Sequence, residues 1–215
     1  MAYSDVQIAN MALSRVMVNQ RIAALDEDST EAAACALWLD PCRDMVLEDL
    51  DWPFARARVI LAETTETPPD GWGYHYAYPA HVIALRGLDV GTSLAGLSLR
   101  YTYQVVYDEA NDRQAILANV SPATMIYTHA ITNPTLFPAS FVHALAWRLA
   151  AELATDISKS RSLRDRCMQE YGLAMSGAAA NAMNQESDGP APEGESVQAR
   201  GTSFTELDAI RQRLL

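Results

Sequence analysis

Few side chains in this sequence have the type and the spacing that acid–base chemistry requires. His143 and Glu152 share one apolar segment, and a histidine beside a carboxylate is a common general acid–base pair. The two residues are nine positions apart, so at about 100° per residue they point to opposite sides of a helix. We therefore expect His143 to be a partly buried polar residue with a hydrogen bond, and not half of a catalytic pair.

The histidines and cysteines also lack the spacing of a metal site. His75 and His81 are six residues apart, with no second pair of ligands beside them in the sequence. Cys35 and Cys42 lie two helical turns apart, too far for both to bind one ion without other ligands. The sequence thus predicts no metal and no cofactor, and it places Cys35, Cys42 and Cys167 on apolar helix faces as reduced thiols.

Carboxylates are densest in one short segment, which contains Asp26, Glu27, Asp28 and Glu31. Two carboxylates facing a cleft are the machinery of many glycosidases, so a hydrolase is an open alternative. However, helix capping and the helix dipole also favour carboxylates at a helix N-terminus. The sequence has no glycine-rich phosphate loop, no Gly-x-Ser-x-Gly and no His-Glu-x-x-His. We therefore expect a protein that is not an enzyme.

The net charge of −11 argues against nucleic-acid binding as the main role of the chain, because cationic contacts to phosphate dominate such binding. One cluster has the opposite sign: Lys159, Arg161, Arg164 and Arg166 fall at the start of a predicted helix, where cations oppose the macrodipole. They could form a solvated face, contact acidic residues of a neighbouring copy or, least favoured of the three, contact DNA phosphate.

Four helices and one β-rich segment are expected to position these residues. Apolar periodicity predicts helices over residues 4–18, 29–50, 138–157 and 160–183. Ser4 with Gln7 and Asp28 with Glu31 have the spacing of capping boxes at the first two starts, while Pro41 should kink or break the second helix near Asp40. The helix over 138–157 is apolar nearly all round, which predicts a central position.

Between the second and third helices, residues 56–131 change to a period of two. Extended runs at 81–88, 99–107, 114–120 and 124–131 with short connections predict an antiparallel meander, and residues 64–73 a loop. The fold class is therefore α+β, mainly α, with a small antiparallel β domain inserted between helices two and three.

The C-terminal part has a different composition. Residues 1–183 form the predicted body, 184–202 an acidic linker with almost nothing apolar, and 203–215 a short amphipathic helix. A helix of this length is marginal alone, so it should dock on a partner through Phe204, Leu207, Ile210, Arg211, Leu214 and Leu215.

The sequence gives no sign of a membrane span or of a secretory signal. No apolar run approaches the roughly 18 residues of a membrane helix, and residues 1–18 lack the basic start and unbroken apolar centre of a signal peptide. We expect no membrane partner and a location in the cytosol where the chain is made.

Four segments, in order over roughly residues 8 to 157, together resemble the tail tubular protein A family of tailed bacteriophages. They are the acidic segment 19–33, Trp52-Pro53-Phe54-Ala55, Tyr76-Ala77-Tyr78-Pro79, and 141–154. The sequence departs from the family pattern at Met17, where a small residue or glycine is expected. Beyond about residue 184 there is no resemblance.

The resemblance implies a structural head-to-tail adaptor in the neck of the virion, assembled in the host cytoplasm. Members form a ring of twelve copies, each with a helical bundle and a small β-rich domain, between the portal protein and a tail tube or nozzle protein. DNA crosses the lumen only as passing cargo. Lys159, Arg161, Arg164 and Arg166 would then lie between subunits. Two alternatives are a particle-associated cell-wall hydrolase and a head-completion connector of a long-tailed phage.

Overall fold

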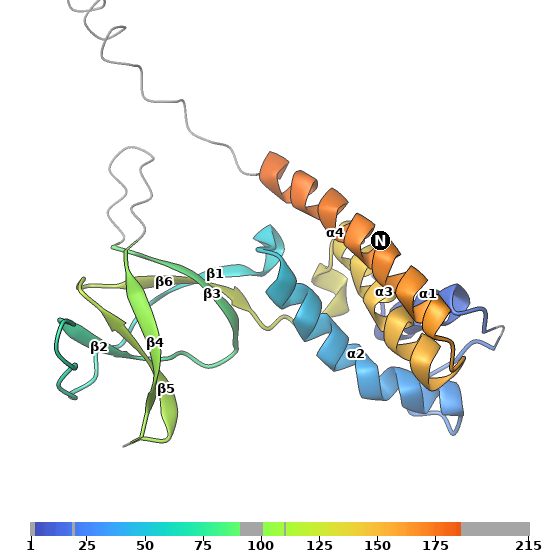
Figure 1. Ribbon diagram of the computed structural model, residues 1–215, viewed down its shortest axis with the longest axis horizontal. Helices are drawn as coiled ribbons and strands as arrows, with labels where there is room; N and C mark the ends of the chain where they lie inside the picture. The colour runs from blue at the N-terminus through green and yellow to red at the C-terminus, as the bar shows by residue number, and fades with distance from the viewer. Residues whose placement is uncertain (1–2, 19, 91–100, 110, 186–215) are drawn as a thin grey trace, which may run out of the picture. The chain divides into compact units, whose positions relative to one another are not determined.

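A computed structural model describes residues 3–18, 20–90, 101–109 and 111–185 of the chain (Figure 1). Its helices are α1 (Asp5–Arg15), α2 (Thr30–Asp49), α3 (Ala139–Asp156) and α4 (Arg161–Gln185). Its strands are β1 (Arg56–Ile60), β2 (Tyr74–Ala77), β3 (Val82–Asp89), β4 (Tyr103–Asp108), β5 (Arg113–Ala118) and β6 (Thr124–His129). Helix exceeds strand by 46% to 21%, so the predicted α+β, mainly α class is confirmed.

Side-chain caps fix where the first two helices begin. At α1 the predicted capping box is present: Ser4 Oγ accepts from the Gln7 amide, and Gln7 Oε1 accepts from the Ser4 amide. At α2 the predicted cap is one residue off, because Ser29 rather than Asp28 accepts from the amide of Ala32. A serine hydroxyl serves this position as well as a carboxylate does, which is why the spacing alone did not separate them.

Of the kink or break predicted near Asp40, a break is wrong, since α2 runs through Pro41 without interruption. Proline removes the hydrogen bond to the carbonyl four residues earlier, that of Leu37. Both Pro41 and Leu37 are exposed, so water can solvate that carbonyl and the helix continues.

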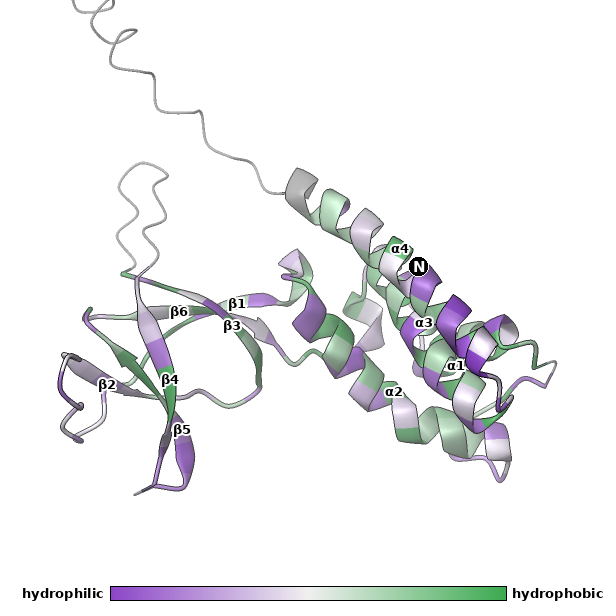
Figure 2. Cartoon of the chain, in the orientation of Figure 1, coloured by the Kyte–Doolittle hydropathy of each residue, from purple (hydrophilic) through white to green (hydrophobic). Residues whose placement is uncertain are grey.

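Helix α3 lies at the centre of the helical core, as its all-round apolar character predicts. It packs against α1, α2 and α4, and ten of its residues are buried, including Phe141, Leu145, Leu149 and Leu153. Figure 2 shows mainly hydrophobic residues along α3 and hydrophilic ones in the first turns of α4. The helices therefore share one core, with the polar start of α4 at its edge.

The β region contains two three-stranded antiparallel sheets instead of the single meander that we predicted. One sheet has the order β1-β6-β3 and the other the order β2-β5-β4. The last strand, β6, pairs with the first and third strands, so sequence neighbours are not sheet neighbours. Alternating apolar residues give a strand its two faces but do not choose its partner, which explains the error.

The C-terminal end of α2 is held by Trp52 and by an arginine of β3. Trp52 donates its indole N–H to the carbonyl of Val46 at 2.7 Å, within the core. One guanidinium nitrogen of Arg86, on β3, lies within 3.0 Å of the carbonyl oxygens of Leu47, Glu48 and Leu50. A cation at the C-terminal end of a helix neutralises unpaired carbonyls and complements the dipole.

Met17 follows the C-terminus of α1 with a positive φ of 62° and a side chain that is 75% exposed. Glycine adopts such a conformation without steric cost, so the expectation of a glycine at this position has a backbone reason. Met17→Gly should raise the free energy of unfolding by about 0.5–1 kcal/mol in urea melts. Leu37→Gly, inside α2 and also exposed, should instead lower it by about 1 kcal/mol. A destabilising Met17→Gly would contradict the strain explanation.

Among the described helices, none combines the length and the apolar character that a membrane crossing requires. α4 ends at Gln185, two residues beyond the predicted end of the last body helix at residue 183. Residues 186–202 of the predicted linker and the predicted docking helix 203–215 lie outside the described residues.

Candidate interaction surface

The cationic cluster lies at the turn that joins α3 to α4. The chain turns at Lys159, which has a φ of 47°, and Ser160 then caps the new helix with Oγ 3.4 Å from the Leu163 amide. Lys159, Arg161 and Arg164 are exposed, as is Arg166 one turn later. The prediction that these four cations lie at or next to the start of a helix is confirmed.

None of these four cations has an ion pair with another residue in the described part of the chain. Cations beside the N-terminal amides of a helix are destabilising by about 0.3–1 kcal/mol each. Within the described residues, no ion pair of the four cations offsets this cost.

A groove lies beside the cationic cluster and is lined by both apolar and polar side chains. It has a volume of about 630 Å³ and is lined by Val16, Met17, Ser158, Ser160, Ser162, Leu163 and Arg166. The hydroxyl of Ser158 donates to the Val16 carbonyl, which ties the end of α1 to the turn before α4. An apolar side chain with a neighbouring carboxylate would match this mixture of groups.

His143 and Glu152 lie on opposite sides of α3, as predicted, and each has its own partner. His143 is exposed rather than partly buried; its ring contacts the guanidinium of Arg15, which also stacks on Trp147 with 4.1 Å to the ring centroid. Desolvation and the neighbouring cation lower the pKa of His143, which favours neutral imidazole. Glu152 forms an i,i+4 ion pair with Arg148 at 2.9 Å.

The acidic segment makes local hydrogen bonds within the loop that precedes α2. Glu27 accepts from the amides of Ala23 and Ala24 and from the hydroxyl of Ser29, and the amide bond to Ala23 contributes most to lowering its pKa. Asn10 of α1 pins the same segment by bonding both the amide and the carbonyl of Ile22. These bonds support a structural role for this segment.

All three cysteines are buried free thiols, as predicted. Burial raises the pKa of Cys35 to about 11 and that of Cys42 to about 12. The raised values mean that these thiols stabilise the fold fully below the ordinary pKa near 9, and that this stability is lost progressively as the pH rises from that value through the raised values.

Between about pH 8 and about pH 10 the free energy of unfolding should therefore fall by roughly 2–3 kcal/mol through Cys35 and Cys42 together. Urea melts at the two pH values measure this loss. In Cys35→Ala/Cys42→Ala the fall should shrink by most of that amount, although the protein is less stable at both values. An unchanged dependence on pH would contradict thiol ionisation as its cause.

The sequence analysis missed one group of potential metal ligands: Glu66, His75 and Asp108 converge in the β region. Pairing of β2 and β4 with the same strand, β5, brings His75 and Asp108 into one sheet. They are 33 residues apart in the sequence, so no local spacing could have revealed them.

No protein-family model matches this chain, and no curated protein matches it either.

Proposed function

We propose that this chain is a structural subunit of a head-to-tail adaptor ring in a tailed bacteriophage. It would join the portal protein to a tail tube or nozzle protein and form part of the DNA channel. One observation carries most of the weight: two of the family-like segments, distant in sequence, pack together. Trp52 and Phe54 meet Phe141 with ring centroids 5.0 and 5.1 Å apart.

The architecture agrees with this assignment. The family is expected to have a helical bundle with a small β-rich domain, and the chain has both, with the strands inserted between α2 and α3. The acidic family-like segment leads into α2, and Tyr76 of the third segment is buried in the β core. The resembling residues thus build the scaffold of the subunit.

Charge distribution supports an assembly role. A net charge of −11 would keep duplex DNA from adhering to a channel wall, because phosphates are repelled. Against that background the exposed cations of Arg161 and Arg164 can steer an acidic surface of a second copy toward the start of α4. Closed rings arise when one patch meets a different patch on the next copy, which is the contact suggested here.

Reconstitution with the portal protein of the same phage tests the proposal. Portal rings mixed with an excess of the chain should acquire twelve copies per portal, measured by light scattering after gel filtration and by native mass spectrometry. The chain alone can remain a monomer until the portal provides a template. Failure to bind portal rings, or binding of only one copy, would overturn the adaptor assignment.

Residues 203–215 are proposed to act as the docking segment. Burial of Phe204, Leu207, Ile210 and Leu214 against a partner would contribute roughly 1.5–3 kcal/mol each before the cost of ordering. Deleting 203–215 should leave the melting temperature of the body nearly unchanged and weaken binding to portal-filled heads. Normal docking of the truncated chain would show that this segment is not the clamp.

A further inference from the structure

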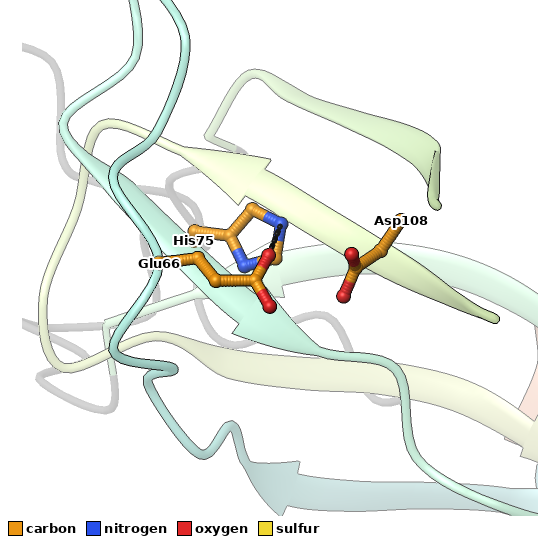
Figure 3. A group of neighbouring side chains, drawn as sticks. All are labelled: Glu66, His75 and Asp108. Atoms are coloured by element: carbon orange, nitrogen blue, oxygen red, sulfur yellow. Dashed lines mark ion pairs between the residues drawn. The ribbon is translucent and has the colours of Figure 1, made fainter. Parts of the chain in front are cut away.

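Three potential ligands converge in the β region, from segments far apart in sequence (Figure 3). Glu66 belongs to the connection between β1 and β2, His75 to β2, and Asp108 to the end of β4. One ligand atom from each lies within 4.8 Å of the other two. His75 and Asp108 are each only 6% exposed, whereas Glu66 is half-buried. A buried imidazole facing two carboxylates is the kind of set that holds a cation.

Contacts with Thr64 fix the orientation of the His75 ring. Thr64 Oγ1 lies 2.6 Å from Nδ1, and the Thr64 amide donates to the His75 carbonyl at 2.9 Å. The other ring nitrogen, Nε2, lies 3.8 Å from Glu66 Oε2, a distance too long for a direct hydrogen bond. Fixing one ring nitrogen by a hydrogen bond while the other faces the ligands is how proteins orient a metal-binding histidine.

Asn111 forms hydrogen bonds with both carboxylates. Its side-chain amide nitrogen donates to Glu66 Oε1 and, at 2.8 Å, to Asp108 Oδ2. A 180° rotation of the Asn111 side-chain amide would place its oxygen where the nitrogen now lies. This oxygen would then be a further ligand in the set. Arg113 Nε, 3.4 Å from Asp108 Oδ2, belongs to a side chain that is 43% exposed, so it can withdraw into solvent when another cation arrives.

We propose that Glu66, His75 and Asp108 form a site for a single divalent first-row transition metal ion, with zinc as the best match. One imidazole nitrogen with carboxylate oxygens suits Zn²⁺, whereas Mg²⁺ and Ca²⁺ select sets made of oxygen alone. Zinc-to-ligand distances of about 2.0–2.2 Å at the tetrahedral angle place two ligand atoms about 3.3–3.6 Å apart. Ligand atoms that are now up to 4.8 Å apart would therefore move together by about 1 Å around the ion.

The ion would have a structural role within the β region. It would join the connection before β2 to the β2-β5-β4 sheet, which already meet through the bridge between Glu63 and Tyr76. Because a preformed site does not exist in the unfolded chain, metal binding energy becomes folding energy. This inference is independent of the adaptor assignment, since it depends only on the local geometry.

Calorimetric titration of the metal-stripped full-length chain with ZnCl₂ tests the site. We expect one equivalent to bind, with a rise in melting temperature that EDTA reverses. X-ray absorption of the zinc form should show nitrogen and oxygen at about 2.0–2.2 Å and no sulfur near 2.3 Å. This spectrum excludes the cysteines as ligands without any substitution.

Matched substitutions locate the ion. Glu66→Gln, His75→Asn and Asp108→Asn should each weaken zinc binding at least tenfold. His81→Asn is the control and should leave it unchanged, because His81 is exposed and its φ of 61° is one that asparagine tolerates. Circular dichroism of the metal-free variants shows whether each one still folds.

Three results would overturn the site. The first is a wild-type chain that binds no zinc at millimolar concentration, which would leave a network of Glu66, His75, Asp108 and Arg113 without a metal. The second is a zinc absorption spectrum with sulfur neighbours. The third is equal zinc affinity in the wild type and in folded Glu66→Gln and Asp108→Asn variants.

Discussion

Replacing Phe141 by alanine is expected to lower the free energy of unfolding by about 3–5 kcal/mol. Phe141 is fully buried, and its ring meets those of Trp52, Phe54 and Phe137 with centroids 5.0, 5.1 and 4.8 Å away. Removing the ring leaves a cavity where α3 packs against the segment after α2, and it also removes two edge-to-face ring contacts and one tilted ring contact. The loss can equal much of the stability of a domain this size.

Urea unfolding followed by fluorescence and by circular dichroism measures the loss. Leu173→Ala is the control, because this leucine of α4 is 68% exposed and should cost less than about 0.5 kcal/mol. Phe141→Leu should fall between the two. A cost below about 1 kcal/mol for Phe141→Ala would show that this cluster does not hold the two family-like segments together.

Reversing two charges at the start of α4 should weaken ring assembly at least tenfold while strengthening the fold. In Arg161→Glu/Arg164→Glu, acidic side chains replace cations beside the N-terminal amides, which favours the helix by roughly 0.3–1 kcal/mol for each carboxylate. The same change would place like charges against the acidic surface of a neighbouring copy. We expect at least a tenfold loss of portal-bound rings together with an equal or higher urea midpoint.

Arg21→Glu/Arg58→Glu provides the matched control for this double variant. It makes the same change in net charge at two exposed arginines outside the cluster. It should retain ring formation, which light scattering of portal mixtures can follow. Equal loss in both double variants would mean that net charge matters and that the cluster is not an interface.

The helices could be predicted closely because their signals are local. Ser4 and Gln7 fix the start of α1 by hydrogen bonds within one turn, and the apolar character of α3 marks its central position. Pro41 was misleading because solvent exposure, which the sequence does not contain, decides whether a lost hydrogen bond ends a helix.

Features that depend on distant pairing could not be predicted. β6 pairs with β1 and β3, and nothing in residues 124–129 specifies those partners. The same pairing problem conceals the group Glu66, His75 and Asp108, which only the folded sheet brings together. Met17 is an instructive contrast: the departure from the family pattern is visible in the sequence, but its physical reason, a positive φ, appears only in the structure.

Electron microscopy of the assembled neck, in the phage particle that contains this chain, tests the adaptor assignment most directly. The proposal predicts a closed ring of twelve copies between portal and tail, with the start of each α4 against the next copy and DNA along the central channel. A single copy, an unclosed cluster, or the absence of this chain from the neck would contradict it.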